Sequence, residues 1–190
     1  HTPPDRIGVI AMLADGAYVP DSTAVEIEDR HAKATFNYVP PDRIGAVRVA
    51  HDALEVYRSF LFAYADVEPI RRWRPRVLVD PANGTASLVL PGLLRELGCD
   101  VVELNCSPNP VPARPSEPRA KTLTEACAKV REHGCDIGIA TDVDADRVLF
   151  IDAAGQCASE DVIGAVFAEE VLSRAEDKLC VSPINSSGLL

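Results

Sequence analysis

Residues 136–152 read Asp136-Ile-Gly-Ile-Ala-Thr-Asp-Val-Asp-Ala-Asp-Arg-Val-Leu-Phe-Ile-Asp152 and form an acidic stretch between two short apolar runs. Both runs are typical of strands, so the acidic residues are expected in a loop between two strands. Side chains two residues apart in an extended or turning segment point the same way. The carboxylates of Asp142, Asp144 and Asp146 can therefore converge on one point.

Three converging carboxylates repel one another, and a hard divalent cation relieves that repulsion. Mg²⁺ fits because it prefers oxygen ligands and commonly shares a phosphate with one or a few carboxylates. A solvated acidic turn is the plainer interpretation, but the third Asp and the adjoining Arg147 favour a metal loop. An EF-hand is excluded, since its sixth and twelfth positions require Gly and Glu, whereas this loop has Arg147 and Ala153 there.

A phosphatase of the haloacid dehalogenase type is an alternative, because it also places Asp-x-Asp after an apolar strand. Asp144 and Asp146 suit that pattern, as does Ser182 after its own apolar run. Such an enzyme needs a downstream Lys and a second acidic motif, and the few residues after Ser182 contain neither. A non-catalytic module that binds a metal and phosphate is a further alternative.

Strand and helix patterns alternate around the acidic loop, which predicts an α/β fold with a mainly parallel sheet and helices on both faces. The expected elements are strand 77–80, helix 85–97, strand 101–104, helix 123–133 and strand 137–140. Ligands of such sheets bind beyond the carboxyl ends of the strands, where the acidic loop begins.

The N-terminal part predicts a hairpin, with an Asp-Gly turn between strands in residues 8–19. A helix is expected to follow through about His31, capped by Asp21 or Ser22. The apolar spacing from residue 52 to residue 62 predicts a helix that is buried on a broad face.

Residues 138–152 resemble the magnesium loop of the α-D-phosphohexomutases, the phosphomannomutase/phosphoglucomutase family, whose usual form is D-G-D-[GA]-D-R before an apolar strand. Three more segments resemble that family in the same order, so the likeness runs through essentially all 190 residues. They are His1-Thr-Pro-Pro-Asp-Arg-Ile-Gly8, Arg76-Val-Leu-Val-Asp-Pro-Ala-Asn-Gly84 and Glu117-Pro-Arg119.

The resemblance implies a Mg²⁺-dependent isomerase that moves phosphate between the 1- and 6-positions of a hexose by way of a phosphoserine. Asp142, Asp144 and Asp146 would bind the Mg²⁺ cofactor, and Arg147 would position the phosphate. The family's phosphoserine would lie directly before His1, which would stand beside it as a catalytic residue. Arg6, Arg114 and Arg119 are weaker candidates for phosphate contacts.

The family has four domains, so the resemblance identifies the chain as an internal fragment, inactive alone. Residues 1–49 would be the C-terminal part of domain 1, residues 50–176 domain 2 with the metal loop, and residues 177–190 the start of domain 3. The implied partners are a hexose phosphate, a hexose 1,6-bisphosphate and the remaining domains of the same enzyme.

One departure from the family pattern is Val143, which replaces the usual Gly of the metal loop. A β-branched residue disfavours positive φ, so the loop is expected to adopt a conformation that is accessible to Val.

Composition is typical of a cytoplasmic enzyme. The net charge of −10 opposes binding to nucleic acid phosphates. No apolar run approaches the ~20 residues that a membrane span requires. The six cysteines show neither C-x-x-C pairs nor zinc spacing, as expected in a reducing compartment. We therefore expect neither nucleic acid nor membrane as a partner.

Overall fold

The computed structural model describes residues 8–47, 49–176, 178–182, 184 and 186, and it divides the chain into two compact units. The units are His1–Asp52 and Ala53–Leu190, and the acidic loop lies in the second. The expected domain limits after residues 49 and 176 stay predictions.

The first unit contains the helix α1 (Asp21–Ala32) and the short 3₁₀ helix η1 (Pro41–Arg43). The predicted hairpin is reduced to one antiparallel bridge between Met12 and Tyr18. An isolated pair of strands is marginal in water, which explains why no longer ladder forms. The predicted cap is wrong, because Pro20 occupies the N-cap position of α1 and no side chain caps the helix.

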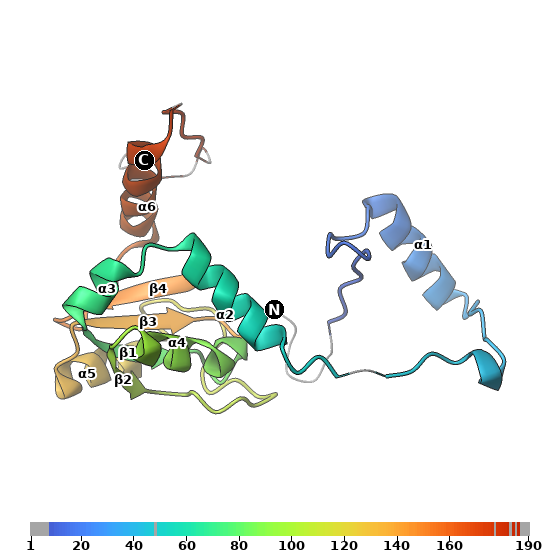
Figure 1. Cartoon of the computed structure of the whole chain (residues 1–190), viewed down its shortest axis with the longest axis horizontal. Helices are drawn as coiled ribbons and strands as arrows, with labels where there is room; N and C mark the ends of the chain where they lie inside the picture. Colours follow the sequence, from blue (N-terminus) through green and yellow to red (C-terminus); the bar gives the residue numbers. More distant parts are fainter. Residues whose placement is uncertain (1–7, 48, 177, 183, 185, 187–190) are drawn as a thin grey trace. The chain divides into compact units, whose positions relative to one another are not determined.

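The second unit contains a four-stranded sheet in the order β2-β1-β3-β4 (Figure 1). Its strands are β1 (Arg76–Asp80), β2 (Asp100–Glu103), β3 (Ile137–Thr141) and β4 (Val148–Asp152). β1 pairs in parallel with β2 and β3, whereas β4 returns antiparallel to β3. The predicted α/β fold with a mainly parallel sheet is therefore confirmed, and the acidic loop is the connection between β3 and β4.

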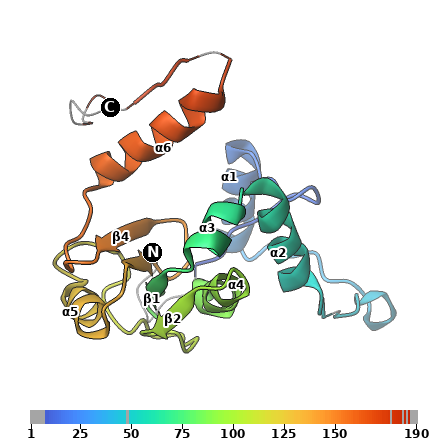
Figure 2. The same cartoon turned by 60° about the vertical axis from the view of Figure 1, so that its left-hand side comes forward.

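Helices cover both faces of this sheet (Figure 2). On one face α5 (Thr124–His133) packs Ala126 and Val130 against Leu78 and Ile151 of the strands. On the other face α4 (Leu90–Glu96) packs against Val77 and its neighbours. All these strand residues are almost fully buried, as expected for a sheet covered on both sides.

The helix predicted over residues 85–97 is interrupted, and the structure has the 3₁₀ helix η2 (Thr85–Leu88) followed by α4. Pro91 explains the break, because a proline ring within a continuous helix clashes with the carbonyl four residues earlier. Pro91 is tolerated in the first turn of a new helix.

The predicted burial of α2 (Ala53–Tyr64) is wrong, because none of its residues is buried in the described structure. Leu54 and Tyr57 are each 51% exposed, and they line an open cavity of about 470 Å³ together with residues of η2, α4 and the acidic loop. Phe62 of α2 packs against the core, beside Ile70 of α3 (Glu68–Trp73).

A last helix, α6 (Glu160–Arg174), was not expected from the sequence pattern. Ser159 caps it, because its hydroxyl oxygen accepts a hydrogen bond from the backbone N–H of Val162 at 3.3 Å. Among the described helices, none combines the length and the apolarity that crossing a bilayer would require.

Candidate metal centre

Buried polar side chains mark the carboxyl ends of β1 and β3. Asp80 ends β1 and is 1% exposed, while Thr141 ends β3 and Asp142 follows it with no exposed surface. Buried polar groups are costly unless they are hydrogen-bonded, and buried charges require partners. The buried polar side chains at this edge of the sheet therefore need hydrogen-bond partners or a compensating charge.

The acidic loop is a tight turn held by its own backbone. Asp142 accepts a hydrogen bond from the backbone N–H of Arg147 through Oδ1 at 3.1 Å, and its carbonyl accepts one from Ala145 at 3.3 Å. Ala145 has a φ of 63°, whereas Val143 does not have a positive φ. The loop thus places its left-handed residue at an Ala, and the expectation that Val143 adopts an ordinary conformation is confirmed.

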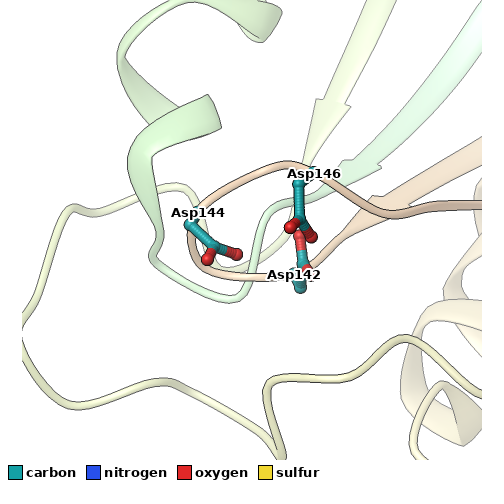
Figure 3. A group of neighbouring side chains, drawn as sticks. All are labelled: Asp142, Asp144 and Asp146. Atoms are coloured by element: carbon teal, nitrogen blue, oxygen red, sulfur yellow. The ribbon is translucent and has the colours of Figure 1, made fainter. Parts of the chain in front are cut away.

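Three carboxylates converge in this loop, as its alternating spacing predicts. One oxygen from each of Asp142, Asp144 and Asp146 lies within 4.8 Å of the others. Asp142 and Asp146 face each other, and the carboxylate of Asp144 turns toward both (Figure 3). Asp142 is buried, whereas Asp144 and Asp146 are exposed to solvent.

The electrostatics of the loop disfavour a charged Asp142. Burial raises the pKa of the Asp142 carboxyl, and a hydrogen bond with Asp146 and the charges of Asp144 and Asp146 raise it further. The backbone N–H of Arg147 opposes this shift of the pKa. The donor set consists of carboxylate oxygens alone, which suits a hard divalent cation such as Mg²⁺, and such a cation would neutralise the repulsion.

The turn after β1 packs closely against the acidic loop. The backbone N–H of Thr85 donates to the carbonyl of Val143 at 2.8 Å, and the Thr85 hydroxyl donates to the same oxygen at 3.2 Å. A Cβ added to Gly84 would lie 2.4 Å from both the Cα and the carbonyl oxygen of Val143. Only glycine at this position allows the two backbones to approach so closely.

Gly84→Ala is expected to destabilise the chain by about 1 to 3 kcal/mol, because backbone atoms rather than a flexible side chain would have to move. Gly92→Ala is the matched control, since Gly92 lies within α4 and an added Cβ would meet nothing within 4 Å. That control should stabilise by up to about 1 kcal/mol. Urea unfolding measures both changes, and equal effects would contradict the close approach.

Arg147 follows the acidic loop directly and is 51% exposed. Its Nη1 donates to Glu117 Oε1 at 2.9 Å, and its Nε lies 3.9 Å from oxygens of Asp142 and Asp146. Arg147 and Glu117 line a cavity of about 320 Å³ together with the start of α6. A half-exposed guanidinium beside three carboxylates is suited to bind a phosphate that a metal ion also contacts.

Glu117 is the site residue that sequence reasoning did not identify. It forms ion pairs with Arg147 at 2.9 Å and with Arg119 at 2.8 Å. The hydrogen bond from Arg119 and the charge of Arg147 lower the pKa of Glu117, so this residue is an anion near neutral pH. The sequence connects Glu117-Pro-Arg119 to the family only by resemblance, and no spacing connects it to a loop 30 residues away.

The other predicted site residues lie in different settings. His1 and Arg6 lie outside the described residues. Arg119 is exposed and pairs with Glu117. Arg114 is 8% exposed and forms an ion pair with Asp80 at 2.8 Å, so the suggestion that it contacts phosphate is wrong.

Comparisons with known proteins point to one family. The family model described as phosphoglucomutase/phosphomannomutase, alpha/beta/alpha domain II, matches residues 55–155. The phosphoglucomutase/phosphomannomutase of Thermococcus kodakarensis is 36% identical over 191 residues, which cover 100% of this chain and 42% of the relative. The phosphoglucosamine/phosphogalactosamine mutase of Sulfurisphaera tokodaii is 29% identical over 194 residues, covering 100% of this chain and 43% of the relative.

One solved structure of the same family matches this chain, and a second matches it in fold. A phosphoglucomutase/phosphomannomutase family protein from Burkholderia thailandensis matches with a TM-score of 0.61 and 26% identity, over 84% of this chain and 33% of that one. A putative phosphomannomutase from Thermus thermophilus matches in fold with a TM-score of 0.64 at 24% identity, over 84% and 35%. The chain spans less than half the length of these proteins. Since the family model covers more than half of its residues, the chain belongs to the phosphoglucomutase/phosphomannomutase family.

Proposed function

We propose that this chain carries the magnesium-binding domain of a phosphohexose mutase, which moves phosphate between the 1- and 6-positions of a hexose. The observation that supports this most directly is the convergence of Asp142, Asp144 and Asp146 beside the half-exposed Arg147. Relatives are named as mutases of glucose, mannose and glucosamine phosphates. The proposed substrate class is therefore a hexose phosphate, without a choice among these sugars.

The residues of the site have separate tasks in this proposal. Asp142, Asp144 and Asp146 would hold Mg²⁺, which when bound disperses the negative charge of the phosphoryl group. Arg147 donates hydrogen bonds to the phosphoryl oxygens, and its planar guanidinium can engage two of them at once. Glu117 accepts a hydrogen bond from Nη1 of Arg147 and so orients this side chain.

The phosphoryl carrier is proposed to be a serine outside these 190 residues, next to His1. The phosphoserine would transfer its phosphoryl group to a free hydroxyl of the hexose phosphate, which yields a hexose 1,6-bisphosphate. After this intermediate reorients, its other phosphate would return to the serine. His1 stays a proposed catalytic residue on the strength of the resemblance, and the other domains of the enzyme would supply the sugar pocket.

The phosphatase alternative is set aside, because the family model and the relatives are those of the mutases rather than of the haloacid dehalogenases. A non-catalytic module that binds a metal and phosphate differs from a mutase in a measurable way. As part of the longer protein proposed here, a mutase domain would support interconversion of the 1- and 6-phosphates of the hexose. A non-catalytic module would not.

The test measures interconversion of the 1- and 6-phosphates of glucose, mannose and glucosamine, with hexose 1,6-bisphosphate and Mg²⁺ present. The longer protein proposed here should convert at least one of them, and its turnover should stop when EDTA removes the metal. The 190 residues alone should give no turnover, because the proposed covalent carrier lies outside them. Turnover by the 190 residues would contradict an external carrier, and no turnover by the longer protein would contradict the mutase.

A further inference from the structure

We propose that Arg114 is a positioning residue, which fixes the acidic loop and Glu117 relative to each other and thereby sets the affinity of the metal centre. This inference rests on the metal site proposed above. Arg114 would act only through the backbone that carries the ligands. The observations that support it are the burial of its guanidinium and the elements to which its hydrogen bonds run.

The guanidinium of Arg114 connects the carboxyl ends of two neighbouring strands. Its Nε donates to Asp80 Oδ2 at 2.8 Å, and its Nη2 donates to the Asp80 carbonyl at 3.0 Å. The same Nη2 donates to the carbonyl of Thr141 at 2.8 Å. Thr141 directly precedes Asp142, so this contact holds the point at which the acidic loop leaves β3.

The other end of the guanidinium holds the segment that leads to Glu117. Nη1 of Arg114 donates to the carbonyls of Pro115 at 3.2 Å and Ser116 at 3.1 Å. The hydroxyl of Ser116 in turn accepts a hydrogen bond from the backbone N–H of Val143 at 3.3 Å. Arg114 is therefore linked to the metal loop from both sides, through β3 and through the segment before Glu117.

These five contacts match the five N–H donors of a guanidinium, one on Nε and two on each terminal nitrogen. The donors of Arg114 are all engaged and its side chain is 8% exposed, so it has no hydrogen-bond donor available for a phosphate. Its role is thus different from that of Arg147, although both are arginines near the same loop.

Asp80 is equally well hydrogen-bonded. Its Oδ1 accepts from the backbone N–H of Ala82 at 3.0 Å and from the side-chain amide of Asn105 at 3.1 Å. A buried ion pair is weak evidence for stability, because desolvation of the charges offsets their attraction. The geometry that the pair imposes is the stronger reason for its presence, since residues behind a metal centre commonly orient the ligands.

The first test is Arg114→Lys, with Mn²⁺ as the probe and its affinity measured by electron paramagnetic resonance on the 190-residue chain. Lysine keeps the charge, so any change in affinity reflects geometry rather than Coulomb attraction. An ammonium on a single stem cannot reach Asp80, Thr141 and Ser116 together. We expect Mn²⁺ to bind about ten-fold more weakly, in the range typical for partners that orient metal ligands.

Val130→Ala is the control for a purely structural effect. Val130 is fully buried next to Gly138 near the start of β3, whereas the acidic loop follows the end of that strand. Its truncation should therefore lower the melting temperature without changing the loop. At a temperature where both variants are folded by circular dichroism, Val130→Ala should bind Mn²⁺ as the wild type does. Equal Mn²⁺ affinity in Arg114→Lys and the wild type would overturn the inference while leaving the metal site intact.

A paired variant keeps the test decisive if Arg114→Lys does not fold. Asp80→Asn combined with Arg114→Met removes both charges, so the net charge is unchanged, and the Asn oxygen can still accept from Ala82 and Asn105. This variant should also bind Mn²⁺ about ten-fold more weakly when folded. Wild-type affinity in the paired variant would overturn the inference. An absence of Mn²⁺ binding by the wild type would instead refute the metal site itself, and this inference with it.

Discussion

Asp142→Asn should abolish measurable Mn²⁺ binding by the chain and should at the same time raise the melting temperature of the metal-free protein. Asp142 is the buried member of the three carboxylates, and burial raises the pKa of its carboxyl. Its ionised form is therefore a cost to the metal-free fold that a neutral amide of the same shape avoids. The amide can still accept the hydrogen bond from the backbone N–H of Arg147 through Oδ1.

The pH dependence of this difference follows from the direction of the shift. A carboxyl with a raised pKa in the folded chain contributes stability below the unfolded value of about 3.9, and that contribution is lost as pH rises through the folded pKa. The advantage of Asp142→Asn over the wild type should thus grow from about pH 4 toward neutral pH. Melting curves in EDTA across this range measure it.

Two comparisons define the metal effect. Asp144→Asn changes an exposed ligand and should weaken Mn²⁺ binding by roughly ten- to a hundred-fold. Asp100→Asn removes the same charge at the start of β2, where Asp100 pairs with Arg76 at 3.1 Å, and should leave the affinity close to that of the wild type. If Asp142→Asn kept wild-type affinity, or if Asp100→Asn lost as much, the loop would not be the metal site.

The sheet was predictable because each of its strands contains a short apolar run of consecutive residues. β1 and β3 lie within one residue of their predicted limits, β4 lies in the apolar run after the acidic loop, and α5 (Thr124–His133) is predicted over residues 123–133. Each of these elements contributes buried apolar side chains to the second unit, among them Leu78, Val130, Ala140 and Ile151, so pattern and packing agree. The apolar side chains of α2 were equally clear in the sequence, yet Leu54 and Tyr57 remain half-exposed among the described residues. The periodicity of a helix sequence shows that one face of the helix is apolar, but it does not show which element covers that face.

The site was predictable only where its residues are close in sequence. Asp142, Asp144 and Asp146 converge because a turn of the chain brings them together. Glu117 and Arg114 reach the same loop across about 30 residues, through the crossover between β2 and α5, and no spacing rule links them to it. In the sequence, Arg114 and Glu117 are simply charged residues in a loop, and such side chains are solvated in most proteins.

In the longer mutase proposed above, Arg147→Lys should keep the fold and lose most of the turnover, by roughly ten-fold to a thousand-fold. The side chain is half-exposed, and its ion pair with Glu117 is worth only about 0 to 1 kcal/mol, so the melting temperature should stay close to that of the wild type. Turnover should fall because an ammonium cannot reproduce the two parallel hydrogen bonds of a guanidinium to a phosphoryl group.

Arg119→Lys is the matched control, since Arg119 pairs with the same Glu117 and is 54% exposed against 51% for Arg147. If Arg147 serves only as a partner of Glu117, the two lysine variants should behave alike in turnover and in melting. If Arg147 instead contacts the phosphoryl group, its variant alone should lose turnover, and it should lose it in kcat because the charge being stabilised develops in the transition state. Unchanged turnover with a lowered melting temperature would make Arg147 a structural partner of the acidic loop, and the metal would then be the only chemistry that this loop contributes.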